Sequence, residues 1–208
     1  MARFGRVDVL VNNAAMRQRD LYPPTGVSTV LGTADDHWDR MFAVNVVGTL
    51  VVTRAFVAPM LEGGGGAIVN VGSRGGMTRP LGDGVWAGVQ PHVRNQPYDA
   101  TKAALASLTF YLADELRERD VAVNVLFPGP TMTTGSAEIR DGRRAHGIAT
   151  ADFLRAEHVV PLMLHLAAQR GRTGETGHGV DVLVWNEQNG HGTPADWIAP
   201  EQPARVTE

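Results

Sequence analysis

Four short runs of apolar residues stand out along the chain, each about as long as a buried strand. Their members are mostly β-branched, and they are continuous instead of alternating with polar residues. Such runs are typical of parallel sheets, in which helices cover both faces. The runs cover residues 7–11, 67–71, 121–127 and 180–185.

Three longer segments between these runs repeat apolar residues with the period of a helix. They cover residues 35–61, 98–119 and 152–170, with Thr33 or Asp35 as the candidate N-cap of the first. Residues 16–34 and 74–97 have no period and are predicted as loops. Strands alternating with helices indicate a single α/β domain over residues 1–208, with a doubly wound parallel sheet and a polar tail from about residue 187.

Composition narrows the class of protein. With 43% hydrophobic and 20% charged residues, the chain has the balance of an ordinary globular domain. A formal charge of −3 without a basic run argues against a nucleic-acid partner, and no apolar stretch predicts a membrane span. The chain has no cysteine, and its seven histidines show no metal-ligand spacing, so no metal is predicted. We expect a soluble, cytoplasmic protein.

Polar and turn-forming residues follow three of the predicted strands. In a parallel sheet the carboxyl ends of the strands meet at one edge, where ligands bind. We therefore expect these residues to lie near one another, and this convergence is stronger evidence than any one motif. They are Asn12, Asn13 and Ala14 after the first strand, Gly72 and Ser73 after the second, and Pro128, Gly129, Pro130 and Thr131 after the third.

Tyr98 and Lys102 are four residues apart at the start of the second helix, so they project from the same helical face. An ammonium group near a phenol favours the phenolate and is expected to bring its pKa down from about 10. A tyrosine adjusted in this way transfers a proton to a carbonyl oxygen or from an alcohol. On its own the spacing is common on helix surfaces, and only the neighbouring motifs favour a catalytic role.

The ordered motifs VNNAA, VNVVG, IVNVG followed by Ser73, YDATK and PGPTMT resemble those of the short-chain dehydrogenase/reductase family over nearly the whole chain. The resemblance implies a Rossmann-type fold, NAD or NADP as cofactor, and interconversion of a secondary alcohol and a ketone. It also implies that Ser73 binds the substrate oxygen, Tyr98 transfers the proton, Lys102 assists it and binds the ribose, and Asn45 holds a relay water. The implied cofactor-binding residues are Asn13, Ala14, Tyr98, Lys102, Pro128, Gly129, Thr131 and Thr133.

One expected motif is missing. Family members begin with a strand, a TGxxxGxG turn and a helix, and neither residues 63–66 nor 174–179 replace that turn, because both precede strands. We therefore expect an N-terminally truncated form of the fold, with an exposed apolar edge strand at residues 7–11 and weak cofactor binding or none. An internal start codon in a longer gene would explain this, and the choice between NAD and NADP is not readable.

The segment between Ser73 and Tyr98 is about a dozen residues longer than the family pattern, and we expect the extra part, with Trp86, His92 and Arg94, to form a pocket wall or lid. Two alternatives to the alcohol–ketone oxidoreductase stay open. One is a cofactor-deficient remnant that acts as a binding or oligomerisation partner, and the other is an isomerase or dehydratase on the same fold. The resemblance also implies a homodimer or homotetramer built on the helices that carry Asn45 and Tyr98.

Overall fold

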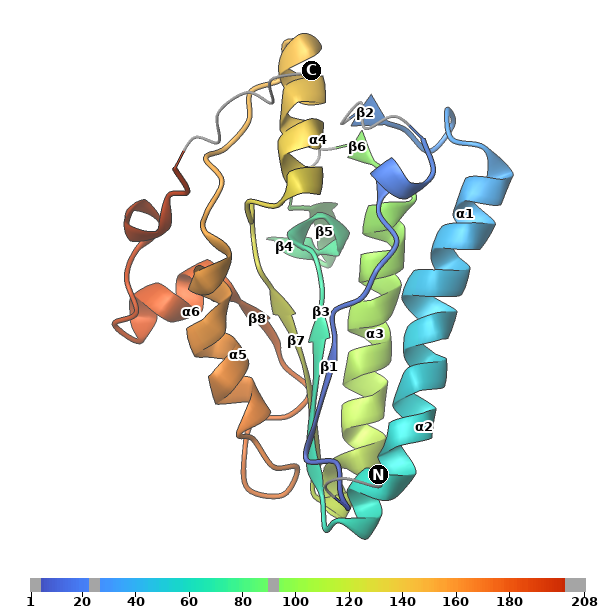
Figure 1. Cartoon of the computed structure of the whole chain (residues 1–208), viewed down its shortest axis with the longest axis vertical. Coiled ribbons are helices and arrows are strands. Elements are labelled where there is room, and N and C mark those ends of the chain that lie inside the picture. Colours follow the sequence, from blue (N-terminus) through green and yellow to red (C-terminus); the bar gives the residue numbers. More distant parts are fainter. Residues whose placement is uncertain (1–4, 23–26, 90–93, 201–208) are drawn as a thin grey trace.

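The computed structural model describes residues 5–22, 27–89 and 94–200. At its centre is a parallel sheet in the order β1-β3-β7-β8. The strands are β1 (Val9–Asn12), β3 (Gly66–Val71), β7 (Val121–Phe127) and β8 (Gly179–Asp181). Their parallel registers bring all four carboxyl ends to one edge, at the top of Figure 1. The predicted α/β class and parallel sheet are confirmed.

Helices cover both faces of this sheet (Figure 1). One face carries a continuous rod formed by α1 (Asp35–Phe42), a π-helical segment (Ala43–Gly48) and α2 (Thr49–Glu62), together with α3 (Tyr98–Leu116). The other carries α5 (Val160–Ala167) and α6 (Val182–Gln188). Adjacent residues of β3 point to opposite faces, so Ile68 packs with Met60 and Leu116, whereas Val69 packs with the buried leucines of α5.

The carboxyl edge carries the smaller elements. These are β2 (Val27–Ser28), which pairs with β6 (Arg94–Asn95), the hairpin of β4 (Thr78–Gly82) and β5 (Val85–Gly88), and α4 (Thr134–Ala145). The hairpin lies within the extra segment before Tyr98, and Trp86 on β5 is 64% exposed. Of the residues expected in a lid, His92 lies outside the described residues.

Four predicted elements differ from the structure. The loop expected over residues 16–34 contains a 3-10 turn (Gln18–Asp20) and strand β2. The run at 180–185 is not one strand, because Asp181 ends β8 and its Oδ1 accepts hydrogen bonds from the amides of Leu183 and Val184, which starts α6. The helix expected over 152–170 begins only at Val160, after a 3-10 turn (Ala156–Val159). The loop expected over 74–97 contains the β4–β5 hairpin, whose turn residues Gly82, Asp83 and Gly84 all have positive φ.

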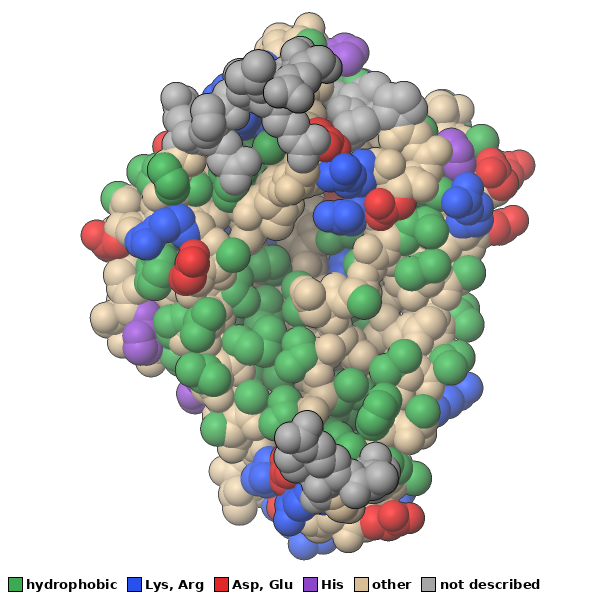
Figure 2. All heavy atoms as spheres, viewed as in Figure 1, with side chains coloured by type: hydrophobic (Ala, Val, Ile, Leu, Met, Phe, Trp, Pro, Cys, Tyr) green, Lys and Arg blue, Asp and Glu red, His purple; other side chains and the backbone are tan. Residues whose placement is uncertain are grey.

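Strand β1 lies at the edge of the sheet, as expected, and among the described residues it pairs only with β3. Val9 and Val11 on this strand are 40% and 42% exposed. Figure 2 shows hydrophobic side chains gathered across the middle of the molecule, where Figure 1 draws β1 and its neighbours. An edge strand of this kind offers unpaired backbone groups to another strand.

The rod Asp35–Glu62 is long and apolar enough to cross a membrane, judged by length and composition alone. Its inward face nevertheless carries two polar side chains, Asn45 and Thr53, that are buried and hydrogen-bonded to the rest of the domain. The polar segment from residue 187 onward contains a 3-10 turn (Pro194–Trp197) that lies beside Arg155.

Candidate active site

The first turn of α3 brings Tyr98 and Lys102 to the carboxyl edge of the sheet. The Nζ atom of Lys102 lies 5.5 Å from the centroid of the Tyr98 ring, as the four-residue spacing predicts. Lys102 is 3% exposed, and its Nζ donates a hydrogen bond of 2.7 Å to the carbonyl oxygen of Val71, the last residue of β3. The lysine is therefore anchored to the strand that leads to Ser73.

The expected lowering of the tyrosine pKa is wrong for the protein as described. Burial, together with the negative charge of Asp99, raises the pKa of Tyr98 to about 12, although Arg17 has the opposite effect. The ammonium group of Lys102 is directed to the Val71 carbonyl, and burial lowers the pKa of this lysine to about 8. The phenol is thus held in its protonated form at neutral pH.

Ser73 follows β3 and begins a 3-10 turn (Arg74–Gly76). Its Oγ accepts a hydrogen bond of 3.2 Å from the amide of Gly75 and lies 3.5 Å from Oδ1 of Asp99. Asp99 was not among the predicted site residues, although it stands beside Tyr98 in the sequence. A carboxylate in the first turn of a helix is usually a solvated helix-terminal charge, whereas this one is 3% exposed.

Asn45 lies in the π-helical segment and is 1% exposed. Its Oδ1 accepts a hydrogen bond of 2.7 Å from the amide of Met16, and its Nδ2 donates to the Met16 carbonyl at 3.0 Å and to Oγ1 of Thr101 at 3.1 Å. Thr101 stands directly before Lys102 on α3. Asn45 therefore joins the loop after β1 to the catalytic helix, and its role in a proton relay stays a prediction.

The segment after β7 contains the other predicted cofactor residues. Gly129 has a φ of +73°, which favours glycine, and its carbonyl accepts a hydrogen bond of 2.9 Å from the amide of Thr131. Thr133 is the N-cap of α4, and its Oγ1 accepts from the amide of Ser136 at 3.2 Å. The four predicted residues of this segment lie at the same edge of the sheet as Tyr98. They are Pro128, Gly129, Thr131 and Thr133. The hydroxyl of Thr133 is engaged in capping α4.

A buried histidine that the sequence did not single out supports this segment. His158 is 0% exposed, and its Nε2 and Nδ1 lie 2.5 Å and 2.6 Å from the carbonyl oxygens of Pro128 and Arg155. It therefore links the segment after β7 to the turn before α5. No single-residue signal marks it, because a lone histidine in an apolar run is usually only a core residue.

Asn13 and Ala14 follow β1 at the carboxyl edge, and both are exposed. Together with Lys102 and the segment after β7, they are the residues predicted to hold the nicotinamide half of a dinucleotide. The glycine runs of the described residues do not fit the pyrophosphate half. A Cβ atom on Gly66 would lie 2.6 Å from the Asp8 carbonyl oxygen, and one on Gly174 would lie 2.6 Å from Oε1 of Gln169, so these two glycines are closely packed.

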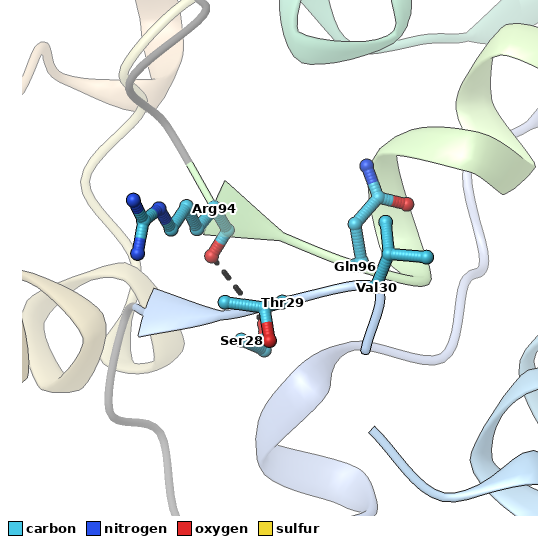
Figure 3. Close-up of a pocket in the computed structure, with 5 residues that line it drawn as sticks. All are labelled: Ser28, Thr29, Val30, Arg94 and Gln96. Carbon is cyan, nitrogen blue, oxygen red and sulfur yellow. Dashed lines mark hydrogen bonds between the residues drawn. The ribbon is translucent and has the colours of Figure 1, made fainter. Parts of the chain in front are cut away.

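Two hollows of moderate size lie near this edge, and neither is lined by Tyr98 or Ser73. The first, of about 340 Å³, lies between β2 and β6, where the side chain of Arg94 points away from that of Gln96 (Figure 3). The second, of about 450 Å³, lies between α3 and the start of β4. In neither hollow do several charged side chains point toward one another.

Comparison with known proteins agrees with this geometry. The family model described as short chain dehydrogenase matches residues 1–144. Fluoren-9-ol dehydrogenase of Terrabacter sp. (strain DBF63) is 43% identical over 99% of this chain, and a short-chain type dehydrogenase/reductase of Picea abies is 32% identical over 81%. The chain spans 57% of the length of each of these two relatives.

Solved structures show the same fold. A 3-ketoacyl-(acyl-carrier-protein) reductase from Brucella melitensis, complexed with NADH, superposes with a TM-score of 0.67 at 26% identity, covering 87% of this chain and 67% of the reductase. A variant of actinorhodin polyketide ketoreductase with NADPH superposes with a TM-score of 0.68 at 27% identity, over the same shares of the two chains. The fold, the ordered motifs and the matched family model together establish that this chain belongs to the short-chain dehydrogenase/reductase family.

Proposed function

We propose that this protein is an NAD(P)-dependent oxidoreductase that interconverts a secondary alcohol and a ketone, with Tyr98 as the general acid and base. The observation that carries the proposal is the meeting of Tyr98, Lys102 and Ser73 at the carboxyl edge of a parallel sheet. The names of the relatives support the reaction class, because one is a fluoren-9-ol dehydrogenase and another is a 3-ketoacyl-(acyl-carrier-protein) reductase complexed with NADH.

The cofactor, NAD or NADP, supplies or accepts the hydride when it is bound. Asn13, Ala14 and Lys102, together with the segment after β7, would hold its nicotinamide half. The hydroxyl of Ser73 donates a hydrogen bond to the substrate oxygen, which fixes that oxygen beside the Tyr98 hydroxyl. Tyr98 then gives its proton to the ketone oxygen during reduction, or takes the proton of the alcohol during oxidation.

The protonation state of Tyr98 sets the pH dependence of the two directions. Because its pKa is raised to about 12, the phenol is the prevailing form at neutral pH and serves reduction as an acid. Oxidation needs the phenolate, so its rate rises with pH. The buried ammonium of Lys102 holds positive charge beside the ring at pH values below about 8, where its own pKa lies.

The test is replacement of Tyr98 by Phe, assayed with fluoren-9-ol and with fluoren-9-one, using both nicotinamide cofactors in turn. We expect kcat to fall by at least about 100-fold, the lower range of general acid–base effects. Tyr111→Phe is the matched control, since Tyr111 is on the same helix but 73% exposed. Unchanged turnover in Tyr98→Phe would refute the assigned mechanism, and circular dichroism checks that the variant is folded.

We also propose that the chain forms a homodimer or homotetramer through the outer faces of α2 and α3. These helices expose large apolar side chains, which favour burial against a partner. On the rod of α1 and α2 they are Val44, Val47, Val51, Val52 and Phe56, and on α3 they are Phe110 and Tyr111. A closed symmetric assembly buries the same patch on each copy.

A further inference from the structure

The Asp99 carboxylate is buried beside two predicted site residues, Tyr98, which would transfer the proton, and Ser73, which would bind the substrate oxygen. It follows Tyr98 in the first turn of α3 and is 3% exposed. Its Oδ1 lies 3.5 Å from Oγ of Ser73, which is within reach but longer than a strong hydrogen bond between oxygens. A buried carboxylate is costly unless polar groups compensate it, so its neighbours decide what it does.

The backbone leaves room for this carboxylate only because residue 75 is glycine. A Cβ atom added to Gly75 would overlap the carboxyl group of Asp99. The same glycine donates its amide hydrogen to Oγ of Ser73 at 3.2 Å. The Ser73 Oγ atom is therefore held between a backbone donor and the Asp99 carboxylate, which fixes the position of the oxygen. Its single hydrogen points to Asp99 over a long contact and turns to the substrate oxygen when substrate binds.

Two side chains from other elements complete the arrangement. Asn95 of β6 favours the charged form of Asp99 and so lowers its pKa, and the Oδ1 atom of Asn95 accepts a hydrogen bond of 2.8 Å from Nη2 of Arg143 on α4. Burial raises the pKa of Asp99 to about 6. The positive charge of Arg143, on the neighbouring helix α4, has the opposite effect and lowers this pKa. Asp99 in turn raises the pKa of Tyr98, whereas Arg17, in the loop after β1, lowers it.

We propose that Asp99 is a positioning residue, whose buried carboxylate holds the hydroxyl of Ser73 and, through Asn95 and Arg143, connects α4 to the catalytic edge. This inference rests on the proposed function of Ser73 and Tyr98. Asp99 would act on the reaction through Ser73, with no direct contact to substrate or cofactor assigned to it. It fixes the side-chain rotamer of Ser73, and so the place of its Oγ, before substrate arrives, which lowers the entropy that binding in the reactive geometry would otherwise cost.

The test compares Asp99→Ala with Asp99→Asn, and Asp114→Ala is the matched control because Asp114 is an exposed aspartate on the same helix. Loss of a hydrogen bond to a charged group corresponds to about a tenfold loss of kcat, which we expect for Asp99→Ala with KM nearly unchanged. Asp99→Asn recovers most of this kcat, because its amide still reaches Ser73. Its pH profile for alcohol oxidation shifts to lower pH, because the charge that raises the pKa of Tyr98 is gone.

A second measurement does not depend on turnover. Carboxyl carbon resonances of ¹³C-labelled aspartate report the midpoint of Asp99, identified by its absence in Asp99→Asn. We expect this midpoint near pH 6 in the native chain and at higher pH in both Ser73→Ala and Arg143→Gln, because each removes a group that favours the carboxylate. A midpoint unmoved by both substitutions, or an unshifted oxidation profile in Asp99→Asn, overturns the proposal. If the titration midpoint of Asp99 shifts in these variants but the native chain shows no turnover, the contacts of Asp99 are supported and the proposed function is refuted.

Discussion

Replacing Asn45 by Ala tests how firmly the loop after β1 is attached to the catalytic helix. The substitution removes an amide that makes three hydrogen bonds, of 2.7 Å and 3.0 Å to the backbone of Met16 and of 3.1 Å to the hydroxyl of Thr101. Alanine suits the helix at least as well, so helix propensity does not mask the loss. The variant leaves the amide and carbonyl of Met16 without these partners.

The expected cost follows from these contacts. A hydrogen bond contributes about 1 kcal/mol net, so three of them contribute about 3 kcal/mol. Oγ1 of Thr101 still donates to the carbonyl of Tyr98 at 2.7 Å, which keeps its hydroxyl partly satisfied and sets the lower limit near 2 kcal/mol. For a chain of this size, each kcal/mol shifts the melting temperature by about 2–4 °C, so we expect a decrease of about 4–12 °C.

The assay is urea unfolding followed by both tryptophan fluorescence and circular dichroism, whose agreement checks for a two-state transition. Asn189→Ala is the control, because Asn189 is exposed and its Nδ2 makes one hydrogen bond, of 2.8 Å, to the carbonyl of Trp185. We expect the control to change stability by less than about 0.5 kcal/mol. An Asn45→Ala variant as stable as this control would show that the Asn45 contacts do not hold the loop in solution.

Two further predictions concern a buried charge and an exposed apolar face. Lys102→Met should abolish turnover but raise the free energy of unfolding at pH 7. The lowered pKa of Lys102, about 8, corresponds to a penalty of about 3 kcal/mol for burying its ammonium group. The hydrogen bond to the Val71 carbonyl offsets about 1 kcal/mol of this penalty. That penalty is complete below pH 8 and disappears as the pH rises toward the unfolded value of about 10.4, so a gain at pH 7 that persisted at pH 10.5 would contradict the reasoning. Val51→Lys should reduce the mass measured by light scattering to that of a monomer, with Leu164→Lys on α5 as the control, and an equal mass in the native chain and both variants would refute the proposed interface.

The central sheet and the catalytic motifs were readable from the sequence because their signals are local. The runs at 67–71 and 121–127 are continuous, β-branched and flanked by turn formers, and the structure places strands there. Tyr98 and Lys102 needed only the helical period to be placed on one face. Polar residues at the ends of parallel strands had to meet at one edge, whatever the loops between them do.

Elements decided by a single capping contact were not readable in the same way. The apolar residues after Asp181 are β-branched and suit a strand, but two hydrogen bonds to one carboxylate oxygen start a helix there. Helix α4 contains two glycines and has no apolar period, and it begins with the reciprocal bonds of Thr133 and Ser136. Asp99 was missed for a related reason, since only the packing of Gly75 against α3 shows that the carboxylate is buried.

The π-helical segment (Ala43–Gly48) also changes the phase of the rod that contains it. In an uninterrupted α-helix, Met60 would lie about 100° around the axis from Met41, at 3.6 residues per turn. A π segment that accommodates one extra residue sets the rotation back by about the same 100°, so both methionines, with Asn45 and Thr53 between them, face the domain and are buried. A single rod thereby serves the catalytic edge at one end and the core at the other. Deleting one residue from the segment would leave a regular α-helix with α2 still facing the sheet, whereas winding all its residues into α-helix would turn α2 away by about 100°.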